Sequence, residues 1–106
     1  MKTLRVIVGE TKNLLFRIRD ANGAPVDLSD SNITFAFRLG IGTESGEYVL
    51  VEKQDSDFDK SNAENGEVSV VCPFMEDGIF YATLEMSQGG FLLDKSKHRV
   101  EVSPEF

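Results

Sequence analysis

Asp55, Asp57 and Asp59 stand at alternate positions and come closest, by type and spacing, to a metal site. The first half of a calcium-binding loop has this spacing, because a hard cation takes several converging oxygen ligands. The rest of that motif is missing, since Lys60 stands where it requires glycine and Gly66 where it requires a bidentate glutamate. The three aspartates are therefore candidates only for a less regular calcium site, and we expect no cofactor.

Cys72 and His98 are the only cysteine and the only histidine of the chain. A catalytic Cys-His pair needs both side chains within hydrogen-bond reach and a third group that orients the base. The two residues lie on different predicted strands, Cys72 before Pro73 and His98 between Lys97 and Arg99. We expect a buried thiol, an exposed imidazole and no enzymatic activity.

Two further features bear on ligand binding. The segment Gly40 to Gly46 is rich in glycine, but no helix follows whose N-terminus could hold a phosphate. Glycan-binding sandwiches commonly present aromatic platforms, whereas this chain lacks tryptophan and its tyrosines, Tyr48 and Tyr81, fall inside predicted strands. A module that recognises calcium or a cell-surface glycan, through Asp55 to Asp59 and the loop 40–46, stays open as the alternative function.

Asp20, Asp27 and Asp30 form a second acidic stretch, within a segment rich in turn residues. Aspartate side chains in turns accept hydrogen bonds from backbone N–H groups nearby in the sequence. We therefore expect these carboxylates to cap their own turns.

The composition is that of a single globular domain with a strong negative charge. The 106 residues carry 11 Lys and Arg against 18 Asp and Glu, a formal net charge of −7. A chain of this length can bury one core without a disulfide or a metal, so we expect one domain over residues 1–106. The charge opposes binding to the phosphate backbone of nucleic acids.

The cysteine count and the N-terminal sequence point to synthesis in the cytoplasm. A single cysteine excludes an internal disulfide. The apolar run Leu4–Val8 is interrupted by Arg5 and is too short for a secretory signal. No later stretch reaches a membrane-spanning length, so neither export nor membrane attachment is expected.

Alternation of apolar and polar residues predicts strands and no helix. Clusters of Gly, Asn, Asp and Ser separate the alternating segments, as in sandwiches with short connections. The predicted strands are Leu4–Val8, Asn13–Arg19, Ile33–Leu39, Glu47–Lys53, Glu67–Cys72, Ile79–Met86 and His98–Val102. The predicted core residues are Leu14, Phe16, Ile18, Ile33, Phe35, Phe37, Leu39, Val68, Val70, Cys72, Phe80, Ala82, Leu84 and Met86.

Strands with one apolar and one polar face favour antiparallel sheets that each keep one wet side. The predicted fold is an all-β, antiparallel, immunoglobulin-like sandwich of about seven strands. Gly89 and Gly90, between two apolar runs, predict a hairpin that joins the last two strands. The loops 40–46 and 55–66 are candidates for contact with other molecules, because binding residues often lie on loops of a rigid scaffold.

The run Arg19 to Ser29, followed by the alternating segment Ile33–Arg38, resembles the start of immunoglobulin-like modules in tail and baseplate proteins of tailed bacteriophages, such as the N-terminal module of baseplate upper proteins. In those modules a strand ends in Asp, a Gly-Pro turn leads to Val-Asp-Leu, and an alternating apolar strand follows. The later segments Asn65–Val70 and Gly78–Met86 resemble the third quarter of the same pattern. None of these segments carries an active-site residue.

The resemblance implies a non-enzymatic structural subunit of a bacteriophage virion, in the tail, the baseplate or the capsid decoration. Its partners would be other virion proteins, with self-association through open sheet edges. The protein would be made in the host cytoplasm and would end in the virion. The resemblance leaves open which virion component this is, and whether the chain is an accessory subunit or one module of a longer protein.

Overall fold

The computed structural model describes residues 3–41 and 48–104, which form strands and two single turns of 3-10 helix. The strands are β1 (Thr3–Ile7), β2 (Thr11–Arg17), β3 (Ile33–Ile41), β4 (Tyr48–Lys53), β5 (Phe58–Asp59), β6 (Glu67–Pro73), β7 (Gly78–Gln88) and β8 (Phe91–Ser103). The 3-10 turns, η1 (Asp55–Asp57) and η2 (Ala63–Asn65), lie on either side of β5 in the chain. Over the described ranges, no helix has the length and apolar character needed to cross a membrane.

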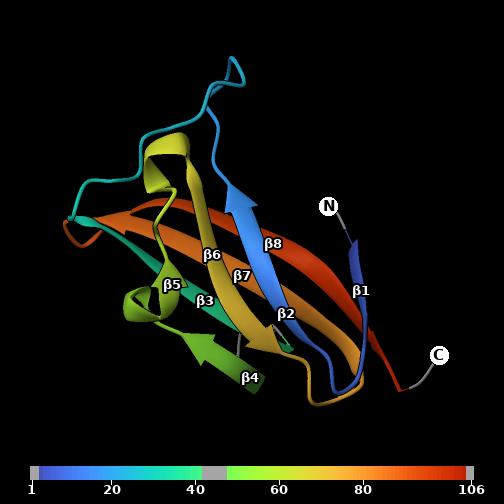
Figure 1. Cartoon of the computed structure of the whole chain (residues 1–106). Helices are drawn as coiled ribbons and strands as arrows, with labels where there is room; N and C mark the ends of the chain where they lie inside the picture. Colours follow the sequence, from blue (N-terminus) through green and yellow to red (C-terminus); the bar gives the residue numbers. More distant parts are fainter. Residues whose placement is uncertain (1–2, 42–47, 105–106) are drawn as a thin grey trace.

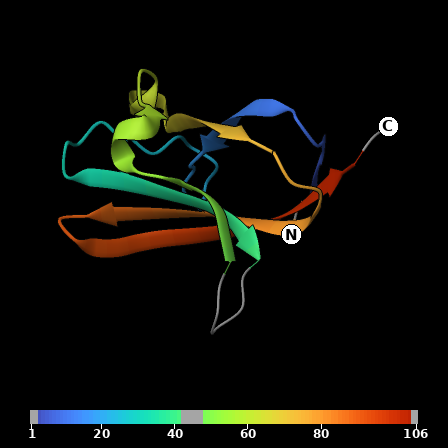
Figure 2. The same cartoon turned by 90° about the horizontal axis from the view of Figure 1, so that it is seen from below.

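The strands form two sheets that pack face to face (Figure 1, Figure 2). One sheet has 5 strands in the order β1-β8-β7-β3-β4, and the other has 3 in the order β2-β6-β5. In immunoglobulin nomenclature, β2, β6 and β5 hold the places of strands B, E and D, while β3, β7 and β8 hold those of C, F and G. The fold is thus an all-β immunoglobulin-like sandwich, as the alternation predicts.

The pairing departs from the prediction at one ladder. β1 runs parallel to β8, from Thr3 beside Arg99 to Ile7 beside Ser103, so the expectation of purely antiparallel sheets is wrong there. The other ladders between described strands are antiparallel. The predicted hairpin is confirmed, because β7 and β8 pair across Gly89 and Gly90, whose φ angles are 57° and 87°.

Two elements are larger or smaller than sequence patterning predicts. β8 begins at Phe91 instead of His98, since the polar stretch before His98 still pairs with β7. β5 has only 2 residues and was missed, because alternation cannot show in so short a strand. The loop 40–46 lies mostly outside the described residues, whereas Gly40 and Ile41 belong to β3.

The core lies between the two layers and is rich in phenylalanine. Phe37 is 0% exposed, and its ring centroid lies 6.2 Å from that of Phe16 on the opposite sheet. A second pair of rings, Phe35 and Phe58, also joins the layers, at 5.5 Å. Such tilted ring pairs add to the free energy gained from burying apolar area.

Most of the predicted core residues are buried, but one group is only half-buried. These exceptions, which pack against the core at its margin, are Leu14, Phe16, Ile18 and Met86. Buried residues that the prediction did not include lie in connections, in the missed strand β5, or in β1 and β8: Val6, Leu28, Phe58, Ala63, Phe74, Val100 and Val102. The half-buried group marks a side of the sandwich where the layers do not close.

Truncation of Phe37 tests the position of this core. We expect Phe37→Ala to lower the free energy of unfolding by about 3–5 kcal/mol, because a fully buried ring leaves a cavity. The control is Phe91→Ala, at a ring 78% exposed on the β7–β8 hairpin, with an expected change within about 0.5 kcal/mol. Urea denaturation measures both, and equal losses would contradict the layering.

Candidate functional site

The three aspartates of the calcium-like segment serve the local backbone. Asp55 accepts a hydrogen bond from the Phe35 N–H at 2.9 Å and lies 2.6 Å from the Lys60 ammonium. Asp57 accepts the N–H three residues earlier at 2.8 Å, and Asp59 accepts the N–H two residues on at 2.9 Å. Among the described residues, no three or more potential ligands are grouped to hold a metal ion.

The turn aspartates behave as predicted. Asp20, Asp27 and Asp30 each accept the backbone N–H two residues on, at 2.9, 2.9 and 2.8 Å. In the case of Asp27, hydrogen bonds from the side chain and backbone of Ser29 hold the pKa of the carboxyl below its usual value. These carboxylates shape the connection between β2 and β3.

Cys72 and His98 lie in different environments. Cys72 is 0% exposed, and burial raises the pKa of its thiol to about 11, which disfavours the thiolate. Its Sγ donates to the Pro73 carbonyl at 3.6 Å. His98 is half-buried, so the prediction of an exposed imidazole is wrong; its side chain lies on the side of β8 that carries the buried Val100 and lines a groove.

The tyrosines form no shared platform in the described part of the structure. Tyr48 is 51% exposed on β4, and its hydroxyl lies 3.3 Å from a carboxylate oxygen of Glu76. Tyr81 is half-buried on β7, with the Lys97 ammonium 4.5 Å from its ring centroid. The Lys97 ammonium thus covers one face of the Tyr81 ring.

One side of the sandwich stays open, between β2 in one sheet and β8 in the other. Among the described strands, β2 pairs only with β6. β1 covers only the end of β8 from Arg99 to Ser103, so the half from Phe91 to His98 has a partner on the β7 side alone (Figure 1). Backbone groups of both sheets therefore reach the surface along this side.

Two adjoining hollows lie along the open side and form what we call the lateral groove. Their volumes are about 360 and 350 Å³, and Leu15, Phe16 and His98 line both of them. Ala82 forms part of the lining of the second hollow, and Leu84 part of that of the first. The groove explains why Phe16 and its inward-facing neighbours on β2 are only half-buried.

The first of the two hollows has a basic lining. Arg17, Arg19 and Lys95 line it together with His98. No described aspartate or glutamate side chain lines either hollow, although the chain carries a net charge of −7. The charge of this lining is therefore opposite to that of the chain as a whole.

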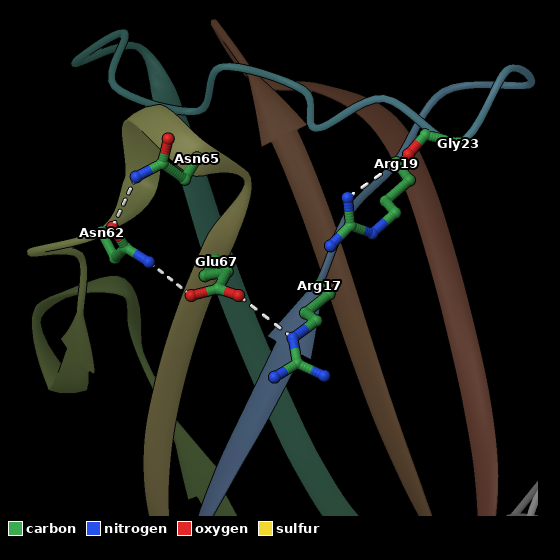
Figure 3. A network of polar contacts seen from close by, with 6 residues as sticks. All are labelled: Arg17, Arg19, Gly23, Asn62, Asn65 and Glu67. Carbon is green, nitrogen blue, oxygen red and sulfur yellow. Dashed lines mark hydrogen bonds and ion pairs between the residues drawn. The ribbon is translucent and has the colours of Figure 1, made fainter.

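Polar contacts fix the end of β2 that borders the groove (Figure 3). The Arg17 Nε donates to a Glu67 carboxylate oxygen at 3.0 Å, and the Asn62 amide donates to the other oxygen. The Asn65 amide in turn donates to Asn62 at 2.8 Å. The hydrogen bond from Arg17, followed by that from Asn62, holds the pKa of Glu67 below its usual value.

Gly66 allows β2, β6 and the following turn to meet closely. Its carbonyl accepts the Ile18 N–H at 2.8 Å, and the Ile18 carbonyl accepts the Val26 N–H at 3.1 Å. The φ angle of Gly66 is +76°, and a Cβ there would lie 2.6 Å from the Ile18 carbonyl oxygen. Only glycine fits this position without moving the end of β2.

Comparison with known proteins assigns no family. No protein-family model matches the chain, and no curated protein matches it in sequence. The function must therefore be inferred from the lateral groove and its surroundings.

Substitution of Gly66 tests how the end of β2 is held. Gly66→Ala should cost at least about 2–3 kcal/mol of unfolding free energy, from the left-handed φ and the backbone clash together. Gly23→Ala is the matched control, because its φ is +82° but no atom lies within 4 Å of the added Cβ. The control should cost only about 1 kcal/mol in thermal or urea unfolding; equal costs would show that the close approach is absent.

Proposed function

We propose that this protein is a non-enzymatic structural subunit of a bacteriophage virion that binds other virion proteins. Support for the phage setting comes from the resemblance of the segments 19–38, 65–70 and 78–86 to phage tail and baseplate modules. The protein-binding role is supported by one observation above all, the open side with its unpaired strand edges and basic groove. Native proteins usually cover or blunt such edges, so an accessible one is a natural place for a partner.

The tip of the β7–β8 hairpin gives further support for a protein partner. Phe91, Leu92 and Leu93 are 78%, 56% and 50% exposed and follow one another directly after the glycine turn. Contiguous exposed apolar residues are typical of surfaces that a partner covers. The tip begins the half of β8 that pairs with β7 alone, so the apolar tip and the open side adjoin along the chain.

The structural features argue less for the alternative function. A calcium site needs converging free oxygens, whereas Asp55 pairs with Lys60 and the other two carboxylates accept backbone N–H groups. A glycan platform needs exposed rings that act together, whereas Tyr48 is exposed on β4 and Tyr81 on β7 has a lysine over its ring. We therefore retain the virion subunit as the proposed function.

The test is the presence of the protein in particles of the phage or prophage that encodes it. Mass spectrometry of purified particles should detect the chain in fixed proportion to known tail or capsid proteins. Phe91→Ala, for which we expect almost no loss of stability, should reduce incorporation several-fold, because the proposed contact with a partner includes the hairpin tip. Particles that contain every other structural protein but lack this chain would refute the virion role.

A further inference from the structure

The hydrogen-bonding groups of β2 divide by residue parity. The Ile18 N–H donates to the Gly66 carbonyl at 2.8 Å, and the Phe74 N–H donates to the Glu10 carbonyl at 2.8 Å. Both pairs continue the register in which Leu14 lies beside Val70. In an antiparallel ladder, hydrogen-bonded and non-hydrogen-bonded pairs alternate, so the even residues of β2 bond to β6.

The odd residues of β2 consequently direct their N–H and C=O groups away from β6. These residues are Thr11, Asn13, Leu15 and Arg17, and β2 has no strand on that side among the described residues. An edge of this kind offers a ready-made ladder to an extended chain. An extended peptide backbone can pair with all of these N–H and C=O groups, because its own N–H and C=O groups also point to one side at every second residue.

The fold itself has a place for a strand here. In the immunoglobulin arrangement, the sheet that contains strands B, E and D carries strand A beside B. β2 holds place B, and among the described residues no strand lies at place A. A strand added there would direct alternate side chains into the lateral groove, towards Phe16 and Leu84.

The charges beside the edge of β2 determine which extended segments would bind there most favourably. Side chains of the added strand that do not enter the groove would share the outer face with Arg17 and Arg19, whose side chains border the groove from that face and alternate with the inward Phe16 and Ile18. Opposite charges at cross-strand positions are favourable, and like charges are unfavourable. Arg17 already pairs with Glu67, but its side chain is 60% exposed and leaves its terminal nitrogens for a second carboxylate.

We propose that the open side binds an extended segment of a partner protein, which adds a strand beside β2 and carries apolar and acidic residues in alternation. The apolar residues fill the lateral groove, and the acidic residues lie beside Arg17 and Arg19. This inference rests on the proposed role as a protein-binding subunit, but not on its place in a phage. A second copy of this chain is a poorer occupant, because its own β2 brings the same arginines to the edge.

A tethered strand tests the proposal even if the free segment binds weakly. A strand of alternating valine and glutamate, as long as the 7 residues of β2, is fused to the full chain through a flexible Gly-Ser linker at the N-terminus. Because Thr3 and Leu4 line the second hollow, the tether starts beside the site. Tethering raises the effective concentration to about millimolar.

The acidic fusion should slow amide hydrogen exchange at Asn13, Leu15 and Arg17 by at least about tenfold, relative to a linker-only chain, and should slow Leu14 and Phe16 by no more than the gain in global stability requires. It should also raise the melting temperature by about 4 °C or more. The matched control replaces each glutamate of the fused strand with lysine and should give at most a small part of both effects. In the double variant Arg17→Gln/Arg19→Gln, the acidic and the lysine strands should have equal effects on amide exchange and on the melting temperature.

Three results would overturn the proposal. The first is that the acidic strand leaves the amides of the odd residues of β2 unprotected. The second is that, without the arginine substitutions, the lysine strand protects these amides as well as the acidic strand does. The third is that these amides become protected in the linker-only chain as the protein concentration rises. The last result would assign the edge to a second copy. If the protein is incorporated into virions but the fused strand does not dock, the proposed function stands and this inference is refuted. If the strand docks but the protein is absent from particles, this inference stands and the virion role is refuted.

Discussion

The contact between Phe16 and Phe37 is the interaction on which the rest of the structure depends. Phe37 belongs to β3 in the larger sheet and Phe16 to β2 in the smaller one, so their rings fasten the layers together at 6.2 Å. Phe37 is fully enclosed, while Phe16 is half-buried and faces the lateral groove. This ring pair thus links the closed interior of the sandwich to its open side. Burial of the two rings stabilises the packing of the two sheets, and that packing places β2 at the edge of the smaller sheet.

The asymmetry between the two sides follows from strand pairing. At the closed side, β5 and the turns around it place Phe58 against Phe35 and bury Leu28 beneath them. At the open side, β1 covers only part of β8, and β2 ends the smaller sheet. Polar contacts around Glu67 and the close approach at Gly66 hold that end of β2 in place. An edge that such contacts hold in place loses less conformational entropy on binding, which favours recognition of an extended chain.

Local periodicity was enough to predict the fold but not the site. Alternation in segments such as Ile33–Leu39 placed Phe35 and Phe37 correctly inside, because side-chain direction in a strand depends only on parity. The alternation of residues within a strand does not show which strands are neighbours in a sheet. The parallel β1–β8 ladder and the free edge of β2 therefore could not be predicted from the sequence. The useful signal was in β8, where the polar Ser96 and His98 share the face of the buried Val100. Polar residues on a core face indicate that the layers part there.

Amide hydrogen exchange along β2 in the unmodified protein tests most directly whether β2 is an edge strand laid over Phe37. The account predicts alternation: slow exchange at the even residues, Leu14, Phe16 and Ile18, which bond towards β6, and fast exchange at the odd residues, Asn13 and Leu15. Uniformly slow exchange at both sets would show that another strand already covers β2. That result would contradict the open side and everything inferred from it.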